Sequence, residues 1–290
     1  MAILINGNTK VIVQGGTGKQ GSIHTKLMYE YGTKIAGIVT PGKGGKKNEL
    51  GINIYDSVID LVKEHEVNTS IVFVPPVNTE AAVLESLNAG IKLVIIITEH
   101  VPVYDTVKIK KAATKNGATV IGPNTIGVIS PGKSKVGIMP ADLYGYGHTG
   151  VISRSGTLTH EVSAILSSSG LGISTAVDIG GDYVVGTDFV PLIEKFYADE
   201  ETSSVVLIGE VGGRKEQAVA EFVEKNGLLK PIFAFIAGRF APESKRMGHA
   251  GAIVTGKGSS AKDKIEILES AGIKVASFPD ELPKMIKTLK

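Results

Sequence analysis

The chain has 290 residues, of which 42% are hydrophobic and 21% are charged, as is typical of a globular protein with sizeable apolar cores. Its net charge of only +2 disfavours a nucleic-acid-binding role, and the lack of cysteine excludes disulfides, thiolate metal sites and cysteine nucleophiles. The length favours about two domains. We find no signal peptide and no apolar run near the ~18 residues that a membrane helix needs, so we predict a cytoplasmic protein.

The first half of the chain alternates short apolar runs with helical patterns, which is typical of a parallel sheet covered by helices. Strands are predicted at Val11–Val13, Ile35–Val39, Ser70–Val74, Leu93–Ile97 and Thr119–Ile121. Helices are predicted at Ser22–Tyr31, Ser57–His65, Thr79–Ala89 and Tyr104–Asn116. The third helix has a capping sequence at Asn78 and Thr79 and a glycine stop at Gly90.

A loop-rich stretch from 130 to 149 interrupts this pattern, and we place a domain boundary within it, near residue 143. Strands then resume at Gly150–Ile152, Ser174–Ile179, Ser204–Ile208, Pro231–Ile236 and Lys274–Ser277. A helix over Ser260–Ala271 places Ala261, Ile265 and Leu268 on one face, and Gly272 ends it. The sequence therefore predicts two α/β domains in series, residues 1–142 and 143–290.

The segment GTGKQG at residues 16–21 matches the pattern G-x-G-x-x-G between the first strand and the first helix. Its glycines let the backbone approach a pyrophosphate, which the helix N-terminus stabilises. NAD binding also requires an acidic residue about 20 positions later, but no Asp or Glu occurs from Tyr31 to Asn48. A glycine-rich loop with Lys43 stands there instead, and its cations suit the extra phosphate of NADP or coenzyme A. The alternative is a tight turn with solvated lysines.

A second glycine loop, SRSGTLT at residues 153–159, also joins a strand to a helix. Its residues Ser155, Gly156 and Thr157 combine hydroxyl groups with free backbone N–H groups, so they form a candidate anion site. The alternative is that Ser155 only caps the helix.

The segment SKRMGHAGA at residues 244–252 holds His249 in a glycine-rich loop beyond the last of several glycine-bearing strand ends. Because the carboxyl ends of parallel strands share one edge, we expect His249 on the same side as the anion loop. A neutral imidazole is a nucleophile, and a carboxylate on its other nitrogen fixes the tautomer; Glu210 is the best-placed candidate. The alternative is a structural or exposed histidine. The six histidines show no metal-ligand spacing, so no metal site is predicted.

Over essentially its whole length the chain resembles the alpha subunits of succinyl-CoA synthetases, the nucleoside-diphosphate-forming succinate–CoA ligases. The resemblance rests on motifs that occur in the family order: QGGTGKQG, YGTKIAGIVTPGKGG, AGIKLVIIITE, IGPN, SRSGTLT, IGGD, LIGEVGG and KRMGHAGAI. It implies a Rossmann-like CoA-binding domain followed by a flavodoxin-like, doubly wound ligase domain that carries a phosphohistidine.

The resemblance also implies roles for individual residues. His249 matches the transiently phosphorylated histidine, and Glu210 matches a glutamate that supports it. The helix whose N-terminus holds the phosphohistidine matches the start at Ser155, Gly156 and Thr157. The family's CoA contacts fall on Thr17, Gly18, Lys19, Gln20, Lys43, Ile97, Thr98 and Glu99.

Two departures from the family pattern concern the carboxylic acid substrate, whose candidate contacts are Asn124 and His160. Asn124 ends a Gly-Pro-Asn motif that cysteine often follows, whereas Thr125 follows it here. His160 stands after SRSGTLT, where tyrosine is common. Both departures leave the phosphohistidine chemistry intact and bear on the identity of the acid.

The implied activity is the reversible formation of succinyl-CoA from succinate, CoA and ATP or GTP, a tricarboxylic acid cycle reaction, through a phosphohistidine and an acyl phosphate. The resemblance places the nucleotide and Mg²⁺ on a separate beta subunit with an ATP-grasp fold, in an αβ or α₂β₂ assembly. The alternatives are a related alpha subunit acting on malate, citrate or acetate, an NADP-dependent oxidoreductase that uses the first glycine loop, and a non-catalytic CoA sensor.

Overall fold

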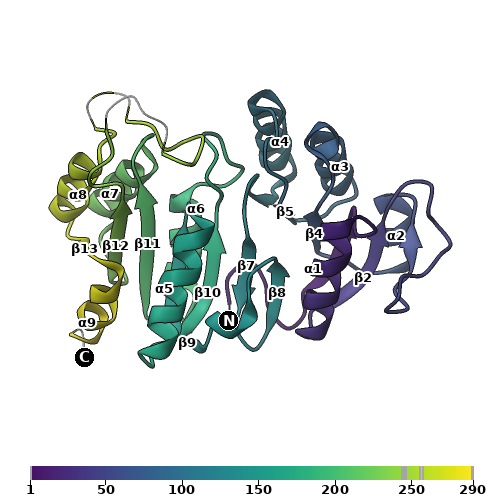
Figure 1. Ribbon diagram of the computed structural model, residues 1–290, viewed down its shortest axis with the longest axis horizontal. Helices are drawn as coiled ribbons and strands as arrows, with labels where there is room; N and C mark the ends of the chain where they lie inside the picture. The colour runs from purple at the N-terminus through teal and green to yellow at the C-terminus, as the bar shows by residue number, and fades with distance from the viewer. Residues whose placement is uncertain (1, 243–246, 255, 257, 289–290) are drawn as a thin grey trace. The chain divides into compact units, whose positions relative to one another are not determined.

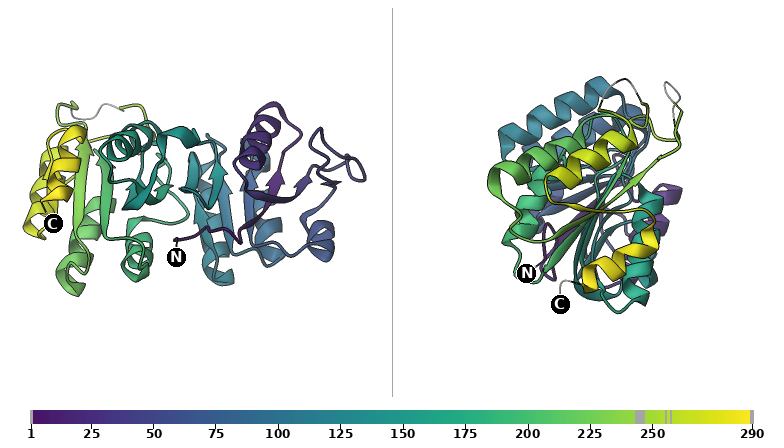
Figure 2. Two further views of the ribbon diagram at one scale, coloured as in Figure 1. Left: turned by 90° about the horizontal axis from the view of Figure 1, so that it is seen from below. Right: turned by 90° about the vertical axis from the view of Figure 1, so that its left-hand side faces the viewer.

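The computed structural model describes residues 2–242, 247–254, 256 and 258–288, and it divides into two compact units. The N-terminal unit comprises Leu4–Met139 with Val184–Thr187, and the C-terminal unit comprises Pro140–Tyr183, the residues from Asp188 onward and the few residues before Leu4. Figures 1 and 2 show a sheet with helices on both faces in each unit.

The N-terminal unit contains a parallel sheet of six strands in the order β3-β2-β1-β4-β5-β6. This is the strand order of the Rossmann fold, so the predicted fold class is confirmed. The strands are β1 Lys10–Gln14, β2 Lys34–Val39, β3 Ile54–Tyr55, β4 Thr69–Val72, β5 Leu93–Ile96 and β6 Thr119–Ile121. The helices are α1 Lys19–Glu30, α2 Val58–Glu64, α3 Pro76–Asn88 and α4 Val103–Asn116.

Helix α1 packs directly against the glycine loop because Gly21 has no side chain. A Cβ atom at this position would lie 2.3 Å from the carbonyl oxygen of Gly15 and 2.9 Å from Cα of Gly16, which is closer than real contacts allow. The close approach aims the N-terminus of α1 at the end of β1, where G-x-G-x-x-G loops hold phosphate groups.

The N-terminal unit differs from the sequence-based prediction in strand β3, which was not predicted, in the start of α3 and in a hairpin after β6. Helix α3 begins at Pro76, with Pro75 as its N-cap, so the start predicted at Asn78 and Thr79 is wrong. Proline suits the first helical position, because its φ is already helical and its missing N–H would lack a partner there. In addition, an antiparallel hairpin of β7 Gly127–Ser130 and β8 Ser134–Gly137 was not predicted; it begins before the stretch predicted as a break and ends within it.

The C-terminal unit contains five parallel strands in the order β13-β12-β11-β9-β10, which is the flavodoxin-like order expected from the resemblance. The strands are β9 Tyr146–Ser153, β10 Ile173–Asp178, β11 Ser204–Glu210, β12 Ile232–Ala237 and β13 Lys274–Ala276. The helices are α5 Gly156–Ser168, α6 Phe189–Ala198, α7 Lys215–Asn226, α8 Ala261–Ser270 and α9 Leu282–Lys287. Short 3₁₀ turns occupy Ala141–Leu143 and Pro279–Glu281.

Each sheet reverses the direction of strand addition at one point, which lies between β1 and β4 in the N-terminal unit and between β9 and β11 in the C-terminal unit. In open α/β sheets, the crevice beyond the carboxyl ends of the strands at such a switch point is the usual ligand site. One group of candidate residues lies at each of these two switch points.

Candidate functional site

A pocket of about 650 Å³ lies at the switch point of the N-terminal unit. The glycine loop after β1 contributes Gly15, Thr17 and Gly18 to its wall, and the segment after β4 contributes 73–75. The end of β2 and one face of α3 complete the lining. The wall is largely apolar, while Gly18, the N-cap of α1, has no side chain to bind the first N–H groups of the helix. The pocket therefore combines an apolar surface with a helix end suited to phosphate.

The lysine-bearing loop after β2 contacts the glycine loop through Lys43. Its Nζ donates a hydrogen bond to Oγ1 of Thr17 over 3.1 Å, and this hydroxyl donates to Oγ1 of Thr40 over 3.2 Å. The structure therefore brings together Thr17, Gly18 and Lys43, while Lys19 and Gln20 lie exposed in the first turn of α1.

The third group of predicted CoA contacts follows β5. The backbone N–H of Ile97 donates to the carbonyl of Val72, and Oγ1 of Thr98 donates to the carbonyl of Val74 over 2.7 Å. Because Val74 lines the pocket, Thr98 supports the pocket wall, whereas Glu99 is exposed to solvent. The backbone N–H of Asn124 donates to the carbonyl of Thr98, which places Asn124 beside this segment.

In the C-terminal unit, the second glycine loop leads into α5. Ser155 is the N-cap, and its hydroxyl accepts a hydrogen bond from the N–H of Leu158 over 3.4 Å, so its side chain caps the helix in this structure. The hydroxyl of Ser153 bonds to both backbone groups of Ser155 and fixes the turn. Thr157 is exposed in the first turn, so the helix end is open to an anion from solvent.

The structure places His249 against Glu210, the last residue of β11. Nδ1 of the imidazole donates to Oε2 of the carboxylate over 2.8 Å; since an ionised carboxylate only accepts, Nδ1 carries the proton. This hydrogen bond, reinforced by the negative charges of Glu210 and Asp178, outweighs burial and Arg154 and raises the pKa of His249. The side chain of His249 is 33% exposed and that of Glu210 is 9% exposed. The imidazole is thus held at Nδ1 by Glu210 while part of the ring is exposed to solvent.

Gly181, in the loop after β10, makes room for the imidazole. A Cβ atom there would lie 2.6 Å from Cγ of His249, so only glycine permits the ring to lie so close to the backbone. The carbonyl of Gly181 also accepts a hydrogen bond from the N–H of Gly251, which fixes the loop that carries the histidine. Lys245 and Arg246, the cations of the same sequence motif, lie outside the described residues.

A buried charged cluster, which we define as Arg154, Glu210, Glu216 and Lys264, lies behind the histidine. Nη2 of Arg154 lies 3.4 Å from Oε1 of Glu210, and Nη1 lies 3.4 Å from Oε1 of Glu216. Lys264 contacts the other carboxylate oxygen of Glu216. Burial alone would raise the pKa of Glu216, but Lys264 and Arg154 outweigh it and lower that pKa, so the carboxylate is ionised. The sequence-based prediction missed Arg154, Glu216 and Lys264.

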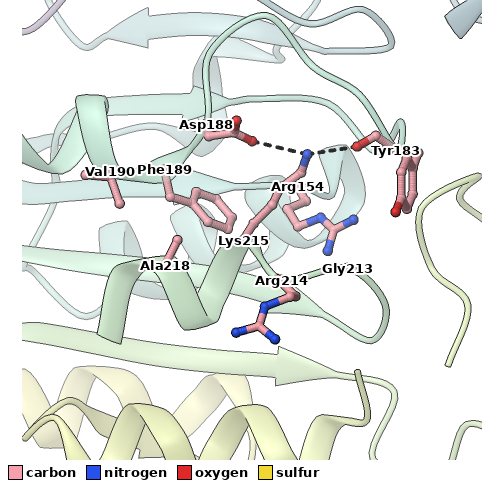
Figure 3. Close-up of a pocket in the computed structure, with 9 residues that line it drawn as sticks. All are labelled: Arg154, Tyr183, Asp188, Phe189, Val190, Gly213, Arg214, Lys215 and Ala218. Carbon is pink, nitrogen blue, oxygen red and sulfur yellow. Dashed lines mark hydrogen bonds and ion pairs between the residues drawn. The ribbon is translucent and has the colours of Figure 1, made fainter. Parts of the chain in front are cut away.

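Arg154 also lines a pocket of about 450 Å³ (Figure 3). Figure 3 shows Lys215 reaching across this pocket, where Nζ lies 3.2 Å from Oδ1 of Asp188 and donates to the carbonyl of Tyr183 over 3.1 Å. Of the charged cluster, Arg154 is the member that lines this pocket.

His160, predicted as an acid contact, lies on α5 near the 3₁₀ turn that precedes β9. Its Nδ1 lies 2.7 Å from the hydroxyl of Tyr144, and the two rings meet edge to face. Burial lowers the pKa of His160, so the imidazole is neutral at pH 7.

No group of three or more histidine or acidic side chains in the described part of the chain is placed to hold a metal ion. No described helix is long and apolar enough to cross a membrane.

Comparisons with known proteins match both units. A CoA-binding-domain family model matches residues 6–100, and a CoA-ligase family model matches residues 152–281. The chain is 49% identical to the succinate–CoA ligase (ADP-forming) subunit alpha 2 of Archaeoglobus fulgidus, over 99% of both chains. It is 50% identical to the corresponding alpha subunit of Methanothermobacter thermautotrophicus, over 98% of this chain and 96% of that one.

Among solved structures, the chain is similar to an ATP citrate lyase from Methanothrix soehngenii in complex with citrate and coenzyme A. The TM-score is 0.90 at 25% identity, and the match covers 99% of this chain. This chain spans only 50% of the length of that lyase chain.

Proposed function

The chain belongs to the family of succinate–CoA ligase alpha subunits, and from this premise we propose that it forms succinyl-CoA reversibly from succinate, CoA and ATP or GTP. The contact between Nδ1 of His249 and Oε2 of Glu210 is the observation that carries the proposal. Glu210 does not contact Nε2, so this ring nitrogen remains available on an imidazole that is one-third exposed, at the switch point of a doubly wound sheet.

In the proposed mechanism, Nε2 of His249 attacks the γ-phosphorus of the nucleotide, a P–N bond forms and the nucleoside diphosphate leaves. Glu210 accepts the hydrogen bond from Nδ1 and stabilises the positive charge that develops on the ring. A carboxylate oxygen of the acid then attacks the phosphorus, which breaks the P–N bond and gives an acyl phosphate. The CoA thiolate attacks the acyl carbon, a C–S bond forms and inorganic phosphate leaves.

The N-terminus of α5, from Ser155 to Thr157, is proposed to stabilise the phosphoryl group on His249. A helix end contributes roughly 0.3–2 kcal/mol to such an anion, which is useful together with hydrogen bonds and too little alone. Support comes from Arg154, which adjoins Ser155 and contacts the loop of His249 through Glu210.

The pocket of the N-terminal unit is proposed to bind CoA, with its phosphates on the glycine loop, Lys43 and the start of α1. The matched CoA-binding family model and the contact between Lys43 and Thr17 support this assignment. The NADP-dependent oxidoreductase is not favoured, because the full-length relatives are ligases. The proposed acid is succinate, with Asn124 and His160 as its candidate contacts.

We further propose a beta subunit with an ATP-grasp fold as the partner that carries nucleotide and Mg²⁺. The relatives are named as alpha subunits, which supports a second kind of subunit. Phe240, 99% exposed in the loop after β12, and Met247, 41% exposed beside His249, are apolar side chains that such a partner can cover. The predicted cytoplasmic location remains part of this proposal.

The test is phosphoryl labelling, in which the chain is mixed with the beta subunit, Mg²⁺ and γ-labelled ATP or GTP. We expect one labelled residue, with a bond that is labile in acid and stable in base, as a phosphoramidate is and a phosphoserine is not. This contrast excludes Ser155 and Thr157, the nearby hydroxyl confounders. CoA plus succinate is expected to discharge the label.

The variant His249→Ala is expected to abolish labelling and turnover while it keeps CoA binding, since CoA is assigned to the other unit. Labelling that persists in this variant, or a label that is labile in base, would contradict the proposal. The purified chain without its partner is expected to be inactive as a ligase, and robust ligation by the single chain would contradict the assigned partner.

A further inference from the structure

Glu210 is held at four separate points, and only one of them involves the reactive histidine. Its backbone N–H donates to Oε1 of Glu216 over 3.2 Å, and its backbone carbonyl accepts from Nζ of Lys264 over 2.8 Å. Its side-chain Oε1 lies 3.4 Å from Nη2 of Arg154, and Oε2 accepts from Nδ1 of His249. A buried ion pair therefore clamps both main-chain groups of the residue that orients the imidazole.

Burying the ion pair of Glu216 and Lys264 costs free energy of folding. Both side chains are 0% exposed, so both charges have lost their hydration. A buried ion pair is often no more stabilising than well-packed apolar side chains of similar volume, because the loss of hydration offsets the attraction. Stability alone therefore gives no reason for this pair, whereas its bonds to Glu210 do.

The backbone around Glu210 needs such a clamp. Gly212 and Gly213 follow it with φ values of +86° and +62°, and glycine has the widest conformational freedom of any residue. Lys264 also donates to the carbonyl of Gly212, so one ammonium group ties the end of β11 and the glycine turn together. Without these bonds, Glu210 would be the last residue of a strand that leads directly into the conformationally free glycines Gly212 and Gly213.

On the premise of the proposed function, we propose that Glu216 and Lys264 are positioning residues for phosphoryl transfer to His249. This pair fixes the main chain of Glu210, and Arg154 holds the carboxylate oxygen Oε1. The other oxygen, Oε2, thereby faces Nδ1 of His249. The imidazole is then held in the tautomer whose Nε2 carries the nucleophilic lone pair. Neither residue contacts His249, so both act through Glu210.

The experiment replaces both members of the pair by neutral side chains of similar size, in the double variant Glu216→Gln with Lys264→Met. Neither position then carries a buried charge without its partner. The control makes the same two chemical changes at Lys262 and Glu266, an exposed i,i+4 pair on the same helix. The His249 ring is observed by ¹⁵N NMR in histidine-labelled protein, in the chain alone and without nucleotide. Labelling with the beta subunit and CoA binding are measured in parallel.

We expect the buried double variant to lower the pKa of His249 toward its ordinary value and to move the proton of the neutral ring from Nδ1 to Nε2. Labelling is expected to slow by about tenfold, less than the roughly hundredfold that a displacement of about 1 Å costs at a reacting group, because Glu210 keeps its carboxylate in this variant. CoA affinity, assigned to the other unit, and the surface control are expected to match the unaltered chain.

The conservative variant Glu216→Asp serves if the double variant fails to fold, because it keeps every charge and only withdraws the carboxylate by one methylene. It is expected to move the ring pKa and tautomer in the same direction. A native pKa, tautomer and labelling rate in a folded variant would overturn the proposal. Because the NMR readout needs neither nucleotide nor partner, it separates this failure from failure of the proposed function, in which the unaltered chain would show the Nδ1 tautomer but no labelling.

Discussion

The sharpest perturbation of the site is Gly181→Ala, which adds one methyl group beneath the imidazole of His249. The added Cβ atom would lie 2.6 Å from Cγ and 2.8 Å from Nδ1 of the ring. Ordinary contacts between carbon atoms begin near 3.4 Å, so the ring must retreat by about 0.8 Å. The ring is free to do so toward solvent, since it is 33% exposed, and the fold is expected to remain intact.

The retreat stretches the hydrogen bond to Glu210, which measures 2.8 Å in the unaltered chain and would pass beyond hydrogen-bond length. A misplacement of about 1 Å at a reacting group costs about a hundredfold in rate, or about 2.7 kcal/mol. We therefore expect labelling of His249 to slow by about that factor, measured by rapid quench with saturating nucleotide and beta subunit.

The matched control is Gly7→Ala, since a Cβ atom at Gly7 would meet nothing within 4 Å. CoA affinity and the melting temperature are expected to stay near native in both variants. If Gly181→Ala is labelled at the native rate, the reasoning is refuted, because the reaction then does not depend on close packing of the imidazole against the backbone of residue 181.

Three further predictions concern Glu210, Lys43 and His160. Because the carboxylate raises the pKa of His249 and the neutral ring is the nucleophile, Glu210→Gln is expected to move the acid limb of the labelling rate to lower pH and to slow labelling without abolishing it. Lys43→Glu is expected to weaken CoA binding more than about tenfold in calorimetry, because it places a negative charge beside the proposed phosphate site. His160→Tyr removes a ring bonded to Tyr144 and is expected to change relative rates among dicarboxylic acids while His249 labelling stays near native.

Each of these predictions has its own contradicting result. An acid limb that stays in place or moves to higher pH would show that Glu210 does not set the pKa of His249. Unchanged CoA affinity, or tighter binding of NADPH than of CoA, would remove Lys43 from the CoA site; Lys47→Glu in the same loop is the control. Loss of labelling without any change in acid preference would contradict the role given to His160.

Much of the fold could be predicted because buried parallel strands produce a simple signal. Runs such as Leu93–Ile96 are apolar on both faces, and glycines follow other strands, such as β1, where the loop turns sharply. Strand β3 escaped prediction because two residues carry no periodicity, and the hairpin strand Ser134–Gly137 escaped because it lacks an apolar run. The start of α3 was misplaced because a capping sequence at Asn78 outweighed the proline signal at Pro76.

The candidate site could be predicted in part. His249 and Glu210 follow from the rule that parallel strands deliver their carboxyl ends to one edge. Lys264 left a signal that was not used: it falls in the same stripe of α8 as Ala261 and Leu268, where a charge requires a buried partner. Which acid pairs with it could not be predicted, because Glu216 lies 48 positions away on another helix.

The charged cluster also ties chemical competence to the completion of folding. Arg154 directly follows β9, and the other members lie in β11, α7 and α8. Arg154 and Lys264 can therefore both reach Glu216 only after most of the C-terminal unit has closed its loops. Contacts between such distant segments form late, because loop closure must be completed before they contribute. A growing chain that still lacks α8 has His249 but no ammonium group on the backbone of Glu210. On the proposed mechanism, the carboxylate that orients His249 therefore reaches its final position only when the whole C-terminal unit is native.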